Sequence, residues 1–293
     1  MMTMSVPLLE VRNIKKYFSV SGGFLAGKAK TVRAVDNVSL ALPQGESVGL
    51  IGESGSGKTT LGRLMMKLMP CDDGRIFFEG EDISRYSQRM MQPIRQKMQM
   101  VFQDPFSSLD PRLTVRRIIE EGLTLQNSLL KKDREEKIRT VLSSVNLPKD
   151  AADYFPHEFS GGERQRIAIA RALIVDPSLL ILDEAVSSLD VLVQEQILKL
   201  LGDLRKRFNL TFLFISHNLR VVQKLTTQVA VMYQGKIVES APMQEMMQNP
   251  LRPYTQRLLS AAINYQVTDH EKDFSISETA LWREAGNGHF VLS

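Results

Sequence analysis

One eight-residue run constrains this chain more than any other feature of its sequence: Gly52-Glu53-Ser54-Gly55-Ser56-Gly57-Lys58-Thr59. It fits the spacing G-x-x-x-x-G-K-[ST], in which a glycine-rich loop between a strand and a helix holds phosphate groups. The apolar run 47–51 before it predicts a short strand, and the run 60–69 after it predicts a helix. The alternative is a Gly-Ser loop before a basic helix cap. A chance match in such a chain is on the order of one in a hundred, so the motif predicts a nucleoside-triphosphate site.

The predicted chemistry of this loop follows from its residue types. Glycines let the backbone fold around phosphates with several N–H groups pointing inward, and the helix N-terminus adds positive partial charge. Lys58 is expected to reach the β- and γ-phosphates, and the Thr59 hydroxyl is expected to hold Mg²⁺. The predicted nucleotide contacts here are Gly52, Glu53, Ser54, Gly55, Ser56, Gly57, Lys58, Thr59 and Thr60.

Composition narrows the class of protein. Hydrophobic residues make up 43% of the 293 residues and charged residues 24%, which is ordinary for a globular protein. No apolar run approaches the ~18 residues of a membrane span, and the first residues do not resemble a secretory signal. Cys71 is the single cysteine, which fits a reducing cytoplasm. The four histidines have no ligand-like spacing, so we expect no structural metal.

The pattern along the chain predicts strands alternating with helices, and hence an α/β fold with a parallel core. Segment 19–30 is expected to be an exposed loop, and the charged region around Lys131 a helical insert with a solvated face. The predicted strands are 8–14, 34–42, 47–51, 74–78, 98–102, 179–182, 211–215, 229–233 and 236–239. Helical patterns cover 115–147, a segment starting near Gly162, and 191–208.

A second chemical element is the continuous apolar run 179–182 followed by Asp183 and Glu184. Such a run predicts a buried strand that delivers two carboxylates to its C-terminal end, where ligands collect in open α/β sheets. Asp183 would hold Mg²⁺ directly or through water. Glu184 would act as general base toward the attacking water. Acids that merely end a core strand are the alternative, which the upstream phosphate loop disfavours.

A third element is Ser160-Gly161-Gly162, a turn that opens a helix. Its N–H groups, hydroxyl and helix N-terminus form a second anion site, which makes sense if it meets a nucleotide held by another copy. The alternative is a helix cap in which Ser160 and Glu163 form a capping box. Both interpretations are compatible, because a cap that exposes its N–H groups also attracts anions.

The order of these elements resembles that of the ATP-binding-cassette ATPases, over about residues 8–262. The matching motifs are Walker A at 52–59, the Q-loop residue Gln103, the signature at 159–163, Walker B at 179–183 with Glu184, the D-loop at 188–190, and the switch histidine His217. The signature departs from Leu-Ser-Gly-Gly-Gln at Phe159 and Glu163, while its Ser-Gly-Gly centre is intact.

The resemblance implies a P-loop NTPase fold over residues 1–262. It would comprise a RecA-like parallel-sheet core, an N-terminal antiparallel β-subdomain and a helical signature subdomain at about 104–172, followed by a C-terminal extension at 263–293. It also implies a head-to-tail dimer of cassettes. Each ATP would be pinched between the Walker motifs of one chain and the Ser160–Gly162 turn of the other, and closure would exclude water.

The resemblance assigns further roles to single residues. Gln103 would sense the γ-phosphate and, with Thr59 and Asp183, the Mg²⁺ ion. His217 would stabilise the γ-phosphate and the developing charge, and Asp190 would couple the two sites across the dimer interface. The adenine-stacking aromatic would be Phe18, with Tyr17 as the alternative.

Several segments are similar to those of the cassettes of peptide and nickel importers: 19–30, 103–112, 154–158 and 249–259, with a weaker likeness in the ending 288–291. The implied protein is an F-type ATP-binding subunit that powers uptake of oligopeptides or dipeptides. The cysteine-rich tail of many members is absent, so we expect no iron–sulfur cluster. The alternatives are nickel or another chelated metal as cargo, and a cassette ATPase that acts on ribosomes or DNA.

The implied partners are two permease subunits, a sister ATP-binding subunit and, indirectly, an extracytoplasmic substrate-binding protein, with no nucleic acid. The implied location is peripheral, at the cytoplasmic face of the inner membrane. Phe106, an aromatic among turn-forming residues, is predicted to anchor the permease; the alternative is that it packs within its own subdomain.

Overall fold

The computed structural model describes residues 6–20, 30–104, 108–123, 130–263, 276–277 and 280–293. The chain divides into two compact units, one formed by Met1–Tyr86 with Leu213–Ser293 and the other by Ser87–Phe212. Within the described ranges, none of the helices combines the length and the apolar character needed to cross a bilayer. The domain boundaries expected from the sequence remain a prediction.

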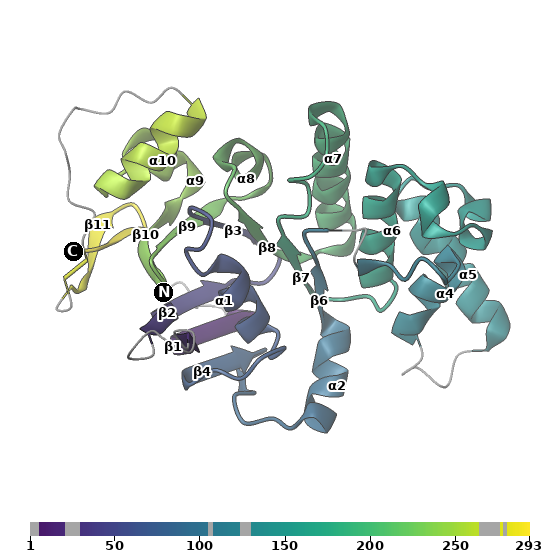
Figure 1. The fold of residues 1–293 in the computed structure, drawn as a ribbon, viewed down its shortest axis with the longest axis horizontal. Helices are drawn as coiled ribbons and strands as arrows, with labels where there is room; N and C mark the ends of the chain where they lie inside the picture. The colour runs from purple at the N-terminus through teal and green to yellow at the C-terminus, as the bar shows by residue number, and fades with distance from the viewer. Residues whose placement is uncertain (1–5, 21–29, 105–107, 124–129, 264–275, 278–279) are drawn as a thin grey trace, which may run out of the picture. The chain divides into compact units, whose positions relative to one another are not determined.

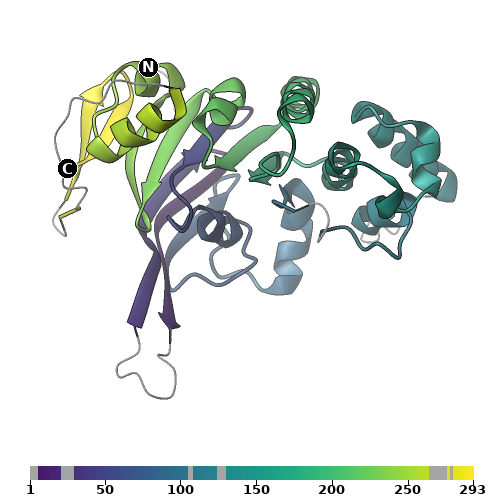
Figure 2. The ribbon, with the colours of Figure 1, turned by 45° about the horizontal axis from the view of Figure 1, so that its top comes forward.

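The first unit contains an antiparallel sheet with the strand order β2-β1-β4-β5. Its strands are β1 (Leu9–Val20), β2 (Lys30–Leu42), β4 (Asp73–Phe78) and β5 (Glu81–Asp82). β1 and β2 run side by side as a long pair, drawn in purple in Figure 2, with Leu9 opposite Leu42 and Phe18 opposite Val32. Leu9 and Leu42 are fully buried, so alternation places one face of the sheet on the core. The predicted strands at 8–14, 34–42 and 74–78 are confirmed, and the first two are longer than expected.

The same unit holds a second run of strands in the order β11-β12-β10-β9-β3-β8. Its strands are β3 (Ser47–Ile51), β8 (Thr211–Ser216, of which the residues from Leu213 belong here), β9 (Gln228–Tyr233), β10 (Lys236–Pro242), β11 (Trp282–Gly286) and β12 (His289–Leu292). β3 and β9 are parallel, with Val48 opposite Gln228, and all five residues of β3 are buried. The predicted strand 47–51 is therefore confirmed at both ends.

The helices of the first unit are α1 (Lys58–Met65), α8 (Leu219–Leu225), α9 (Met243–Gln248) and α10 (Pro253–Ile263). α1 starts at Lys58, within the phosphate-loop motif and two residues before the predicted start at Thr60, and it ends four residues before the predicted end at Met69. The other three were not among the predicted helices. α10 lies in contact with α8, and both are labelled in Figure 1.

The hairpin of β11 and β12 was also not predicted. Its turn contains Asn287 and Gly288, both in the left-handed region at φ 54° and φ 70°. An Asn-Gly pair is the favoured sequence for a two-residue hairpin turn, because its strand-matching geometry needs positive φ at both positions. β12 in turn pairs with β10, with Val291 opposite Glu239. The 288–291 segment thus extends the sheet of the first unit.

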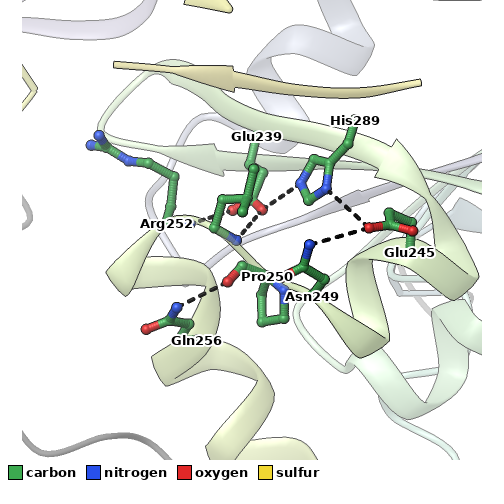
Figure 3. A network of polar contacts seen from close by, with 8 residues as sticks. Glu239, Glu245, Asn249, Pro250, Arg252, Gln256 and His289 are labelled. Carbon is green, nitrogen blue, oxygen red and sulfur yellow. Dashed lines mark hydrogen bonds and ion pairs between the residues drawn. The ribbon is translucent and has the colours of Figure 1, made fainter. Parts of the chain in front are cut away.

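A buried polar network joins this hairpin to the start of α10 (Figure 3). The Glu239 carboxylate is fully buried and accepts hydrogen bonds from the backbone N–H groups of Leu251 at 2.7 Å and Arg252 at 3.0 Å. His289 Nε2 donates to Glu239 Oε1 at 2.7 Å, and its Nδ1 lies 3.9 Å from Glu245 Oε1. A buried carboxylate is costly unless its lone pairs are used. Glu239 therefore connects three segments of the chain: β10, on which it lies, residues 251–252 before α10, and β12.

Replacing His289 by Leu should lower the free energy of unfolding by about 1–3 kcal/mol, because a fully buried carboxylate loses one of its donors. The measurement is the midpoint of urea unfolding. Phe290→Ala is the matched control, since the neighbouring Phe290 is exposed on the other face of β12. Equal midpoints for His289→Leu and the control would contradict the structural role of His289.

The second unit is formed by α2 (Gln88–Lys97), β6 (Met98–Val101), α4 (Val115–Glu120), α5 (Lys131–Ser144), α6 (Gly161–Leu173), β7 (Leu179–Asp183) and α7 (Val191–Phe208). Among the described residues of this unit are also three short 3₁₀ segments: η1 (Glu121–Leu123), η2 (Lys149–Asp153) and η3 (Pro156–Glu158). β6 and β7 are parallel, with Met98 opposite Leu179. The predicted helix 191–208 is confirmed at both ends, whereas the helical pattern 115–147 contains α4, η1 and α5 rather than one continuous helix.

Candidate functional site

The phosphate loop lies between β3 and α1 and follows a path that side chains would obstruct. A Cβ atom at Gly52 would lie 2.2 Å from the carbonyl oxygen of Met232, and one at Gly57 would lie 2.1 Å from that of Ala34. Gly57 also has φ 108°, which favours glycine. By contrast, the space beside Gly55 is open. Close backbone packing therefore requires glycine at positions 52 and 57, whereas at Gly55 only the positive φ of 80° favours glycine.

Lys58 lies along this loop with only 5% of its surface exposed. Its Nζ donates to the carbonyl oxygens of Gly52 and Glu53, both at 2.8 Å, and approaches Ser56 Oγ at 3.4 Å. Thr59 and Thr60 are half-buried in the first turn of α1. The predicted contact residues 52–60 thus form one continuous segment with its cation inside the curve of the loop.

Two residues that the sequence analysis did not assign to the site contact the same loop. The backbone N–H of Glu53 donates to Tyr254 Oη at 2.9 Å, and Arg257 Nη2 donates to Glu53 Oε1 at 2.5 Å. Both belong to α10. Segment 249–259 had been noted only for its family resemblance, and no local pattern indicates a contact more than 200 residues away in the sequence.

Phe18 and Tyr17 on β1 differ in what they can offer a ligand. Tyr17 Oη donates to Asp36 Oδ1 at 2.6 Å, and this bond raises the pKa of Tyr17 above its ordinary value. Phe18 is 39% exposed, with Lys16 Nζ 5.7 Å from its ring centroid. The exposed ring of Phe18 is therefore better suited to stacking on a base than the engaged ring of Tyr17.

In the second unit, Asp183 and Glu184 lie where β7 ends. Asp183 is only 3% exposed, and Glu184 takes a left-handed backbone conformation at φ 48°. The Glu184 carbonyl accepts from the N–H of Ser187 at 3.1 Å and from its hydroxyl at 2.9 Å, which closes a turn. Because β6 is parallel to β7, with Val101 opposite Leu182, Gln103 leaves the same edge of this strand pair as Glu184. The predicted carboxylates and the predicted Q-loop residue therefore share one edge.

The turn at Ser160 contains the predicted capping box. Ser160 is the N-cap of α6. Its hydroxyl and backbone N–H donate to Glu163 Oε2 at 2.7 and 2.9 Å, and its hydroxyl accepts from the Glu163 N–H at 3.4 Å. The hydrogen bonds from Ser160 hold the pKa of Glu163 below its usual range, so this carboxylate is ionised at neutral pH. The cap uses the N–H of Ser160, so an anion would be met by the N–H groups of Gly161 and Gly162.

The start of α6 packs against the start of α7. A Cβ atom at Gly161 would lie 3.6 Å from Leu189, which is ordinary contact, whereas one at Gly162 would lie 2.4 Å from Val193. Asp190 is the N-cap of α7, and its Oδ1 accepts from the N–H of Val193 at 3.0 Å. The predicted signature turn and D-loop therefore adjoin within the second unit.

His217 follows β8 in the first unit and is exposed. The next residue, Asn218, starts α8 by accepting from the N–H of Arg220 at 3.1 Å. Phe106, the predicted permease anchor, lies outside the described residues. In the part of the chain that the structure describes, no group of three or more His, Cys, Asp or Glu side chains could hold a metal.

Known proteins are similar to this chain in sequence. The family model described as ABC transporter matches residues 35–187. The oligopeptide transport ATP-binding protein AppF of Bacillus subtilis (strain 168) is 49% identical over 255 residues, covering 87% of this chain and 78% of the relative. The oligopeptide transport ATP-binding protein OppF of the same organism is 44% identical over 303 residues, covering 99% of this chain and 97% of the relative.

Solved structures show the same fold. The dimeric ATP-binding cassette MJ0796, in a post-hydrolysis state with ADP and phosphate, superposes with a TM-score of 0.71 at 24% identity, covering 80% of this chain and 98% of that one. The protein cbiO1 of Clostridium perfringens, part of the ABC transporter complex cbiONQ, superposes with a TM-score of 0.71 at 23% identity. The match covers 88% of this chain and 96% of that one. These likenesses confirm the predicted P-loop cassette fold.

Proposed function

This chain belongs to the ABC transporter family, and on that premise we propose that it is the ATP-hydrolysing subunit of an importer for oligopeptides or dipeptides. Family membership makes it an ATPase. The observation that supports the cargo is its 44% identity, over 99% of its length, to a protein named for oligopeptide transport. The transported molecule would pass through separate permease subunits.

ATP would bind with its phosphates in the loop of residues 52–60. Gly52, Gly55 and Gly57 carry no side chain that could keep a phosphate from the backbone N–H groups, and the Lys58 ammonium is bonded to the loop carbonyls of Gly52 and Glu53. On binding, Lys58 would exchange its carbonyl partners for phosphate oxygens, which bear more negative charge. The exposed ring of Phe18 would stack on the adenine.

The residues proposed for Mg²⁺ are Thr59, Gln103 and Asp183. A hydroxyl, an amide oxygen and a buried carboxylate are the hard oxygen donors that Mg²⁺ prefers, so the donor set fits the ion. When bound, the ion would neutralise charge on the phosphates.

Hydrolysis would use Glu184 as general base for the attacking water. Its backbone is held in a closed turn by Ser187, which fixes the direction in which the side chain leaves the strand. Gln103, at the same edge of the strand pair, would sense the γ-phosphate. His217 would stabilise the charge that develops on it.

The Ser160–Gly162 turn would act on the ATP held by a second cassette, either another copy or a sister chain. The start of α6 is capped by Ser160 and still presents the N–H groups of Gly161 and Gly162. These two groups could bind a phosphate of an ATP that is held by the phosphate loop of another cassette. Asp190, whose segment adjoins this turn, would couple the two sites. The further partners would be two permease subunits and, indirectly, an extracytoplasmic substrate-binding protein, at the cytoplasmic face of the inner membrane.

The test is ATP-driven uptake by proteoliposomes that contain this chain and the permease subunits that co-purify with it. We expect labelled tripeptide to accumulate only when ATP and the substrate-binding protein are present. Accumulation of labelled nickel instead of peptide would reject the proposed cargo but keep the importer. Failure of any permease to co-purify would reject the importer itself.

The two-cassette arrangement makes a separate prediction. Gly161→Asp should spare ATP binding by the isolated chain but lower hydrolysis by about 10²-fold, because it places negative charge where N–H groups meet the γ-phosphate of the partner. Nucleotide titration and phosphate release measure the two effects. Gly161→Ala adds only a methyl group in ordinary contact with Leu189, so its ATPase should fall much less. Loss of ATP affinity by Gly161→Asp alone would place the turn in the same site as its own phosphate loop and overturn the arrangement.

A further inference from the structure

We propose, on the premise that the phosphate loop binds ATP as proposed above, that Tyr254 and Arg257 of α10 are positioning residues for that loop. Tyr254 would hold the backbone of Glu53, and Arg257 would neutralise its carboxylate. Both lie outside the 35–187 segment that the family model matches. Neither side chain need touch the nucleotide, since both act through Glu53.

Tyr254 is built as a rigid support. It is only 1% exposed, and its ring packs on Tyr233 with the centroids 4.3 Å apart. Burial raises the pKa of Tyr254, so its hydroxyl stays neutral. That hydroxyl accepts a hydrogen bond from the backbone N–H of Glu53. The backbone carbonyl of Glu53 in turn accepts a hydrogen bond from Lys58 Nζ. Tyr254 therefore fixes a residue that holds the phosphate-binding lysine.

Arg257 pairs with the one carboxylate of the phosphate loop, that of Glu53. A carboxylate at Glu53 would repel a triphosphate bound to the same loop. Arg257 pairs with this carboxylate at 2.5 Å, and its guanidinium lies 5.7 Å from the Tyr254 ring centroid. The paired side chains are 49% and 50% exposed, so the pair contributes little to folding stability. Its main effect is on the local field at the phosphates.

α10 can serve as a support because its own start is anchored. The carboxylate of Glu239 accepts the N–H groups of Leu251 and Arg252, just before α10 begins, and His289 secures that carboxylate (Figure 3). The buried network, α10 and the phosphate loop all belong to the first unit. Hydrogen bonds therefore connect the hairpin network to the loop through one helix.

The first experiment is Tyr254→Phe in the full chain, which removes only the hydroxyl. We expect the Kd for ATP to rise about two- to tenfold, as for one lost hydrogen bond, with kcat unchanged at saturating ATP. Tyr233→Phe is the matched control, because it removes a hydroxyl from the packed neighbouring ring. An unchanged Kd for Tyr254→Phe, or an equal rise in the control, would overturn the role of Tyr254.

The second experiment is a double-mutant cycle of Arg257→Gln and Glu53→Gln. Arg257→Gln alone should raise the Kd for ATP about two- to fivefold, more at low ionic strength, and should have no effect when Glu53 is already Gln. Arg283→Gln, at an exposed position in β11, controls for loss of one positive charge. Additive effects in the cycle would overturn the role of Arg257.

The experiments distinguish failure of the function proposed for the phosphate loop from failure of the positioning roles proposed for Tyr254 and Arg257. If the wild-type chain does not bind ATP, or if Lys58→Ala binds it equally well, the function proposed for the loop is wrong. If the wild-type chain binds ATP, Lys58→Ala does not, and the α10 variants match wild type, only the positioning roles are wrong.

Discussion

A chain with Glu184→Gln is expected to bind ATP with wild-type affinity and to hydrolyse it about 10²- to 10⁴-fold more slowly, the usual loss when a general base is removed. The amide has the shape of the carboxylate but cannot accept the proton of the attacking water. The turn that begins at Glu184 is made by its backbone carbonyl and Ser187, so the substitution leaves the turn in place. The effect should fall on turnover alone.

Phosphate release measures the rate, and size-exclusion chromatography with ATP should show the variant accumulating as a closed dimer, or as a heterodimer with its sister chain. Glu195→Gln, the same chemical change at an exposed position in α7, is the matched control and should keep wild-type turnover. Near-normal hydrolysis by Glu184→Gln would exclude this residue as the general base.

The second large effect is expected for Lys58→Ala, which should weaken ATP binding itself. Loss of one partner of a buried charge pair costs about 2–5 kcal/mol, which corresponds to about 30- to 4,000-fold in Kd. Lys58 is buried in the loop and bonded to two of its carbonyls, so the variant loses both the cation and the link that closes the loop. Isothermal titration with ATP gives the affinity directly.

Lys67 provides a control for the structural part of this effect. Its Nζ donates to the carbonyls of Ile83, Ser84 and Tyr86 at 2.8, 2.8 and 2.9 Å, outside the phosphate loop. Lys67→Ala should lower the unfolding midpoint but leave the Kd for ATP unchanged. If both variants lost the same affinity, the loss would reflect general stability and not phosphate binding.

The parts of the fold that were predictable are those encoded by local patterns. The strand 47–51 is a short, mainly apolar run and the helix 191–208 follows an Asp N-cap, and both were predicted with correct ends. The helix α2 was missed because Pro93 lies in its interior and its composition is polar. The hairpin at 282–292 was missed although its Asn287-Gly288 turn is a recognisable signal.

In the candidate site, too, the residues in local motifs were predictable from sequence, whereas the tertiary contacts were not. Residues 52–60, Asp183 and Ser160 could be placed on their elements from sequence because each motif marks the end of a strand or the start of a helix. The contacts of Glu53 with Tyr254 and Arg257 could not, because they depend on tertiary packing between segments far apart in the chain. Likewise, the pairing of Tyr17 with Asp36, which separates it from Phe18, depends on the register of two strands.

The long separation between Glu53 and its two supports has a consequence during translation. Arg257 follows Glu53 by 204 residues, and ribosomes add about 5–20 residues per second. The phosphate loop of a nascent chain therefore exists for about 10–40 s before the helix that braces it has been synthesised. During that interval the loop lacks the hydrogen bond from Tyr254 and the counter-charge of Arg257. The complete set of contacts around Glu53 can therefore form only after α10 has been synthesised.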